Sequence, residues 1–206
     1  PVLAFREFGL NDDNYIVTRP NRPVQADVRL KSLSDSCYVA VYADENEQLM
    51  QIAHVVVNDL NIKELMTIVP VPDMPSMGGI LNLDAYYIDQ EENFLLEGTL
   101  DANRFVYEGA AVGDFDSWFS YAPRGETVHA IDANLAFNGS EFLALDGVYD
   151  AEGEGRLDAN LRLQDMPVSM LNPFIPDQLV GFQGTLSSDM TVAGPMDALL
   201  FNGALM

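Results

Sequence analysis

The stretch GRLDANLRLQ, residues 155–164, decides the fold class. Apolar residues or glycine occupy every odd position of this stretch, and polar or charged residues occupy every even position. Successive side chains of a β-strand point to opposite faces of the sheet. The pattern therefore predicts a strand with one apolar face and one polar face.

The same alternation recurs along the chain. It predicts strands at 24–31, 37–43, 49–58, 80–88, 93–101, 104–111, 127–137, 142–149, 182–192 and 199–205. Ser188 is the one polar residue at an apolar position of its strand. Two segments, 61–69 and 167–172, instead fit short helices that run into proline-containing stretches. The sequence thus predicts an all-β, antiparallel protein with two short helices.

An internal repeat is visible at offsets of 105 to 107 residues. The matching pairs are VYADE at 41–45 with VYDAE at 148–152, NDLNIKEL at 58–65 with QDMPVSML at 164–171, and GILNLD at 79–84 with GTLSSD at 184–189. These pairs predict a first repeat at 20–112 and a second at 125–206, after a leading segment 1–19 of unclear assignment and with an inter-repeat turn at 113–124.

Tandem copies favour an elongated, curved sheet with an open groove over a closed sandwich. Alternation alone fits both arrangements, because the apolar face either lines a trough or fills the space between two layers. Twelve apolar side chains are assigned to this face by their positions in the alternating pattern. They are Val24, Val28, Leu30, Val39, Val41, Ile131, Leu135, Leu157, Leu161, Leu163, Met190 and Val192.

Composition excludes several classes of protein. The 206 residues include 10 Lys and Arg against 32 Asp and Glu, for a formal net charge of -22, and 48% are apolar. So much core material argues against a disordered acidic tail. The charge argues against nucleic acid and anionic membrane surfaces as partners. No apolar run reaches the roughly 18 residues of a membrane-spanning helix.

Few residues are suited to catalysis or metal binding. His54 and His129 lie singly inside strand patterns, and the lone Cys37 has no intrachain disulfide partner. The acidic segments 44–47 and 150–154 are expected turns whose spacing does not match a calcium-binding loop. We therefore predict no enzyme, no catalytic residue, no metal and no cofactor.

Aromatic residues gather in one short segment between the two repeats. Trp118, Phe119 and Tyr121 would suit either a packed turn or an exposed patch on a carbohydrate-binding sandwich. We favour the packed turn.

The last third of the chain resembles a known family. The segments LRLQDMPVSMLNPFIP at 161–176, GFQGTLSSDMTVAG at 181–194 and PMDALLFNGAL at 195–205 together are similar to a recurring segment of the TamB family, within the AsmA-like group. The match is close over 161–206 and fainter over 50–89, through the internal repeat.

Departures from the family pattern are small. The family favours a polar residue where this chain has Pro195, and often a proline where it has Leu199 or Leu200.

The resemblance implies a long envelope protein of double-membraned bacteria, tethered to the inner membrane and reaching across the periplasm. Such proteins look like a folded-over β-sheet, a β-taco, with an apolar trough. The family is implicated in phospholipid movement between the membranes, and in outer-membrane protein assembly beside a BamA-like barrel of the TamA type. No catalytic residues come with the resemblance.

The two ends of the sequence predict a fragment of a longer protein. It begins at Pro1 without Met and stops inside an expected strand, so any inner-membrane anchor is expected outside it. The alternative to a lipid-carrying trough is a scaffold whose open strand edges bind partner or client β-strands by augmentation.

Overall fold

A computed structural model describes residues 2–3, 6–48, 50–68, 74–90, 93–153, 155–175 and 181–205. Within these ranges the chain forms fourteen strands and two short helices. The strands are β1 (Val2–Leu3), β2 (Arg6–Leu10), β3 (Tyr15–Val17), β4 (Gln25–Ser32), β5 (Tyr38–Glu45), β6 (Gln51–Asn61), β7 (Met77–Gln90), β8 (Asn93–Tyr107), β9 (Ala110–Pro123), β10 (Val128–Phe137), β11 (Ser140–Asp150), β12 (Arg156–Pro167), β13 (Thr185–Pro195) and β14 (Leu200–Leu205). The helices are α1 (Ile62–Ile68) and the 3₁₀ helix η1 (Val168–Phe174).

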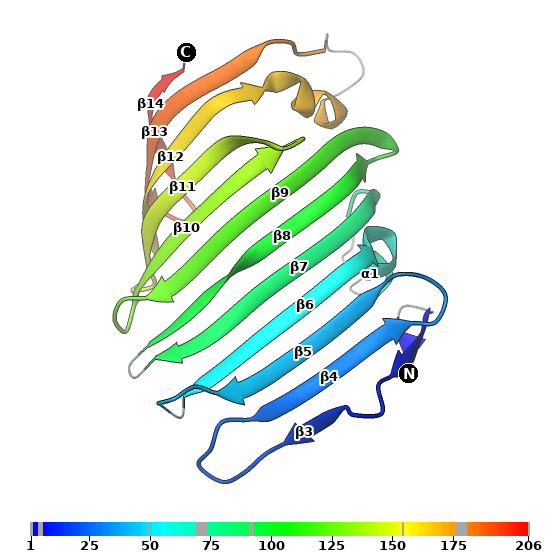
Figure 1. Ribbon diagram of the computed structural model, residues 1–206. Coiled ribbons are helices and arrows are strands. Elements are labelled where there is room, and N and C mark those ends of the chain that lie inside the picture. The colour runs from blue at the N-terminus through cyan, green and yellow to red at the C-terminus, as the bar shows by residue number, and fades with distance from the viewer. Residues whose placement is uncertain are drawn as a thin grey trace.

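All of these strands belong to one open, curved sheet (Figure 1). From β4 to β14, every strand pairs antiparallel with the strands next to it in sequence. β2 and β3 both pair with the other side of β4, and β1 pairs with β2. The prediction of an all-β, elongated, curved antiparallel sheet is confirmed.

Antiparallel order places the connections along two opposite sides of the sheet. These sides are formed by the ends of the strands and not by the outermost strands. We call one the turn edge, which carries the connections β5–β6, β7–β8, β9–β10, β11–β12 and β13–β14. The other is the helix edge, where α1 joins β6 to β7 and η1 joins β12 to β13 (Figure 1). Every strand between β6 and β13 therefore runs from one edge to the other.

The two predicted helices are present as α1 and η1, although residue 69 of the first lies outside the described residues. They begin at Ile62 and Val168, and 106 residues separate these positions, which is the offset of the sequence repeat. α1 packs against β6 and β7, and η1 packs against β9.

The best-packed apolar cluster lies under η1. Phe137, Phe142, Met166 and Met170 are each at most 9% exposed there. Partly buried side chains surround them: Val112, Phe115, Leu135, Leu143, Leu163, Val168, Leu171 and Leu186. η1 therefore covers the helix-edge end of the apolar face. Elsewhere, Cys37 is fully buried, as expected for a packed thiol.

Most of the apolar face carries no second layer. The chain exposes 12929 Å² to solvent, whereas a compact monomer of its mass exposes about 9,500 Å². Only one of the two surfaces of a sandwich sheet would face water, but both surfaces of this sheet are accessible over most of their length. The sandwich alternative is therefore wrong.

Two sequence predictions, one at the end of the first repeat and one between the repeats, need correction. The segment 113–124 is not a turn, because β9 runs through it. The segment 104–111 is not one strand, because it spans the end of β8, the connection and the start of β9. Asp114 and Asp116 gave the segment a turn-like composition, although strand β9 displays them in extended backbone.

Two glycines bend the sheet toward its apolar face. Gly98 lies opposite Ala85, and Gly147 lies opposite Ala159. A Cβ atom at Gly98 would lie 2.8 Å from the Ala85 Cα, and one at Gly147 would lie 2.8 Å from the Ala159 Cα. Neighbouring backbones thus approach more closely on this face than side chains would allow, which is how glycine curves a sheet.

We expect Gly98→Val to destabilise the sheet by about 1–3 kcal/mol, the cost of overpacking a filled site. The new side chain would overlap the backbone of β7 and force β7 and β8 apart. Denaturant unfolding followed by circular dichroism measures the change. The control is Thr99→Val on the opposite face, which should change stability by less than about 0.5 kcal/mol; equal effects of the two would contradict the account of the bend.

Candidate functional site

Three parallel rows of residues cross the apolar face, each defined by cross-strand pairing. The central row runs from β4 to β14 through Val28, Val41, Val55, Ala85, Gly98, Phe119, Ala133, Leu145, Leu161, Met190 and Gly203. No polar side chain interrupts it. We call this face, with its three rows, the trough.

The flanking rows are also largely apolar. Toward the turn edge lie Ala26, Ala43, Ala53, Tyr87, Leu96, Tyr121, Ile131, Gly147, Ala159, Val192 and Phe201. Toward the helix edge lie Leu30, Val39, Val57, Leu83, Leu100, Ser117, Leu135, Leu143, Leu163 and Ser188. Val41 and Leu100 are still 37% and 39% exposed, so the trough is open to solvent.

The structure brings eleven of the twelve predicted trough residues together on this one face. Val24 is the exception, because it precedes β4 and lies outside any strand. Its backbone N–H donates to the Gln51 side-chain oxygen at 2.7 Å, which ties the start of β4 to β6.

The two serines of the trough do not present unsatisfied hydroxyls. Ser117 Oγ donates to the Leu100 carbonyl at 2.7 Å, and Ser188 Oγ donates to the Ala204 carbonyl at 2.8 Å. Ser188 is also 1% exposed. Since each hydroxyl is bonded to a neighbouring strand, the polar interruption of the helix-edge row is small.

Aromatic rings line the turn edge of the trough, and we call this group the aromatic belt. It consists of Tyr87, Phe94, Tyr121, His129 and Tyr149. Consecutive rings lie 5.3, 5.8, 5.3 and 6.2 Å apart between centroids. The Tyr121 hydroxyl lies 2.8 Å from His129 Nδ1. The belt runs across β7 to β11.

The belt was missed in the sequence, although its signal is there. Tyr86 and Tyr87 are consecutive, so the alternation does not show at once which of the two lies on the apolar face. Counting in steps of two from Leu83 and Ala85 would have placed Tyr87 on the apolar face.

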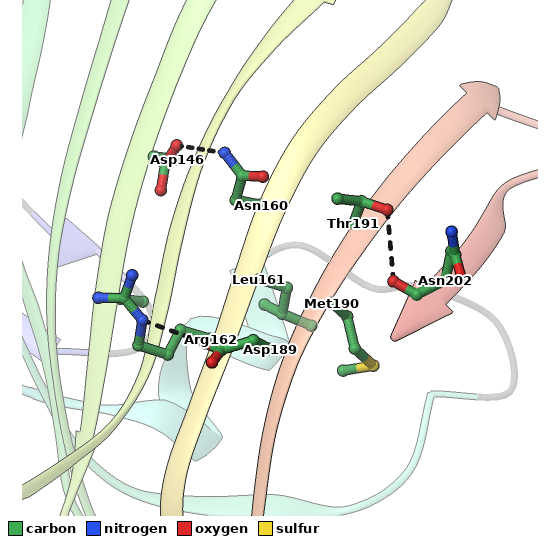
Figure 2. Close-up of a pocket in the computed structure, with 9 residues that line it drawn as sticks. Asp146, Asn160, Leu161, Arg162, Asp189, Met190, Thr191 and Asn202 are labelled. Atoms are coloured by element: carbon green, nitrogen blue, oxygen red, sulfur yellow. Dashed lines mark hydrogen bonds and ion pairs between the residues drawn. The ribbon is translucent and has the colours of Figure 1, made fainter. Parts of the chain in front are cut away.

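The opposite face of the sheet is polar and strongly acidic. On β11 to β14 its side chains surround a shallow depression of about 320 Å³ (Figure 2). There Asn160 Nδ2 donates to Asp146 at 2.9 Å, and Arg162 Nε lies 3.2 Å from Asp189. The side chains of this Arg–Asp pair are 69% and 76% exposed. This arrangement suits a solvated surface, because the polar groups bond to one another in full contact with water.

His54 belongs to the polar face and has a structural explanation. Its ring stacks on Tyr86 with centroids 3.9 Å apart, and its Nε2 lies 2.8 Å from Asp84 Oδ1. A stacked, hydrogen-bonded ring of this kind fits the prediction of an ordinary strand residue.

The three aromatics of β9 do not form a carbohydrate-binding patch. Phe119 and Tyr121 face the trough, whereas Trp118, at the intervening position, projects from the polar face and is 40% exposed. The packed turn favoured from the sequence is also wrong, since all three residues lie within β9.

Two carboxylates on the polar face have pKa values that are shifted in opposite directions. Asp101 lies directly across from Asp116, and partial burial, followed by the charge of Asp116, raises the pKa of Asp101. At the turn edge, the backbone N–H of Glu152 and then the Thr127 side chain lower the pKa of Asp150.

No cluster of three or more His, Cys, Asp or Glu side chains that suits a metal ion occurs among the described residues. In the same part of the chain, no helix is both long enough and apolar enough to cross a bilayer. Compared with known proteins, the chain matches no family model, no curated protein and no solved structure.

We expect Asp101→Asn to raise the free energy of unfolding at neutral pH by about 0.5 kcal/mol, because like charges opposite each other destabilise a strand pair. The pKa of Asp101 is raised in the folded protein. The penalty for its ionised form is therefore present at neutral pH and disappears as the pH falls through that raised value. Denaturant titrations at neutral and acidic pH measure the difference between variant and wild type.

Asp150→Asn is the control of opposite sign. Because the pKa of Asp150 is lowered in the folded protein, its carboxylate stabilises the fold above its ordinary pKa, and this contribution is lost as the pH falls through the lowered value. The variant should thus be less stable than wild type at neutral pH. Destabilisation by Asp101→Asn, or a gain that grows in acid, would contradict these assignments.

Proposed function

We propose that this chain is a non-enzymatic, periplasmic β-groove segment of a TamB-like protein, and that its trough carries phospholipid acyl chains between the two membranes. The observation that carries the proposal is the central row, which presents only apolar side chains or glycine from β4 to β14. The sequence resemblance at 161–206 supports the same assignment.

Physical chemistry favours this occupant. Each CH₂ group that leaves water for an apolar surface gains about 0.8 kcal/mol. Because neighbouring strands offer equivalent apolar positions, an acyl chain can move along the trough without returning to water. The acidic outer face keeps such an open sheet in solution and repels other sheets of the same charge.

The wider setting is part of the proposal. An anchor outside this segment would tether the full-length protein to the inner membrane. A BamA-like outer-membrane barrel of the TamA type would be its partner, so that the segment also supports outer-membrane protein assembly.

We expect Leu161→Arg to reduce the amount of phospholipid that the chain retains by severalfold, because a charge in the central row must be desolvated by any acyl chain beside it. Native mass spectrometry after detergent-free purification counts the bound lipid. Photo-crosslinkers at Leu145 and Met190, which flank Leu161 in the central row, should join to acyl chains in the wild-type background.

The matched control is Asn160→Arg, which adds the same charge one residue away on the polar face beside Asp146. It should retain lipid like the wild type, as should Asp158→Asn on the same face. A wild-type chain that holds no lipid and gives no acyl crosslinks, although its circular dichroism is that of a folded sheet, would refute the proposal.

A second candidate function is supported by the last strand. In the described part of the chain β14 pairs with β13 alone, and Leu200 and Phe201 on it are 73% and 64% exposed. An open edge of this kind offers backbone groups to a partner or client strand.

Asn202→Pro separates the two functions, since proline has no N–H to offer and disfavours strand pairing, and Asn202 lies on the polar face of β14, outside the trough. If the edge binds partner strands, pull-down of an outer-membrane barrel substrate should fall severalfold while retained lipid is unchanged. Asn202→Thr, which keeps the N–H and the strand propensity, is the control. Equal partner binding by both variants would remove the augmentation candidate.

A further inference from the structure

We propose that the trough holds a zwitterionic phospholipid crosswise, with its headgroup at the aromatic belt and its acyl chains directed toward η1. This inference rests on the proposed lipid-carrying function and adds an orientation, a headgroup site and a lipid class to it.

The first support is a difference between the two long sides of the trough, the turn edge and the helix edge. At the turn edge, three tyrosine hydroxyls and one imidazole stand at the margin of the apolar rows. Tyrosine combines an apolar ring with a polar tip, and it is enriched where hydrocarbon meets headgroups in membranes. The belt thus provides the same transition from apolar to polar surface.

The helix-edge side of the trough is lined by apolar aromatic and methionine side chains instead. Phe105 and Phe115 pack edge to face at 5.9 Å, and Phe115 lies 5.2 Å from Phe137 between centroids. Above them, η1 contributes Met170 to the same cluster. Aromatic hydrocarbon and thioether groups under a cover of this kind offer no partner for a phosphate, but they suit the ends of acyl chains.

The width of the trough, measured along the strands, matches one lipid leaflet. On β9, Tyr121 in the belt and Phe115 at the far end are six residues apart, which is about 20 Å along an antiparallel strand. One leaflet, with its headgroup region included, is about 20–22 Å thick, half of the full bilayer. A phospholipid placed along the strands therefore reaches from the belt to the η1 cluster.

The negative charge around the trough favours a zwitterionic headgroup over an anionic one. The belt and the three rows carry no Lys or Arg, and the chain has a net charge of -22. Asp89 shares the belt's edge and face by its pairing with Phe94. An anionic headgroup would be repelled here. A zwitterionic one fits, because its phosphate can accept bonds from tyrosine and histidine donors while its cation meets aromatic faces and a carboxylate.

His129 has a specific part in this arrangement. When the Tyr121 hydroxyl donates to Nδ1, at the observed 2.8 Å, the neutral imidazole carries its proton on Nε2. That N–H is then the donor left for a phosphate oxygen. Tyr149, next to His129 across the β10–β11 pair, places a hydroxyl on the same side.

Two photoreactive phosphatidylcholines test the orientation on the full chain. One carries a diazirine in its headgroup, and the other carries it at the end of an acyl chain. Peptide mapping should find the headgroup probe on Tyr149 and Leu157 at the turn edge, and the acyl probe on Met166 and Met170 at the helix edge. Equal distribution of both probes, or the reverse distribution, would overturn the orientation while leaving lipid carriage intact.

A variant tests the headgroup contacts. His129→Phe combined with Tyr149→Phe should lower headgroup crosslinking about fivefold, the effect of losing two neutral hydrogen bonds, with acyl crosslinking per bound lipid unchanged. Tyr86→Phe, on the polar face, is the matched control. An unchanged yield would overturn the headgroup site, and the absence of both probes from the wild-type chain would overturn the proposed function as well.

Discussion

Cross-strand register is the constraint on which the whole structure depends. Because side chains alternate along a strand, a slip of one residue between any two neighbours would turn that strand's apolar side chains to the polar face. Pairings such as Val28 with Val41 and Leu161 with Met190 keep the central row continuous. The trough exists only because this register persists from β4 to β14, and every functional statement about acyl chains follows from it.

An open sheet must remain soluble and ordered without a second layer. Charge on the outer face provides solubility, and hydrogen bonds between neighbouring strands bind its polar groups, as in the Asn160–Asp146 pair. On the inner face, Ser117 and Ser188 bond to neighbouring backbones, so they cost little in apolar surroundings. Among the described residues, only the cluster under η1 resembles a conventional core, which makes the helix edge the better-packed side of the trough.

Much of this fold can be predicted from the sequence, because alternation is a local signal. The pattern at 155–164 predicts β12 and its apolar face directly, and the proline-bounded segments predict α1 and η1. The signal failed at β9, where Asp114 and Asp116 sit in a strand whose outer face tolerates charge. The aromatic belt could not be predicted as a unit, since Tyr121, His129 and Tyr149 meet only through the register of three strands.

The central claim is that the trough is the uncovered face of a single layer. Solution X-ray scattering from the lipid-free chain, measured at monomer mass during size-exclusion chromatography, tests it most directly. A compact domain of 206 residues has a radius of gyration of about 17 Å. An open, one-layer sheet should give a clearly larger value and the elongated distance distribution of a curved plate. A radius near 17 Å with a globular distribution would contradict it.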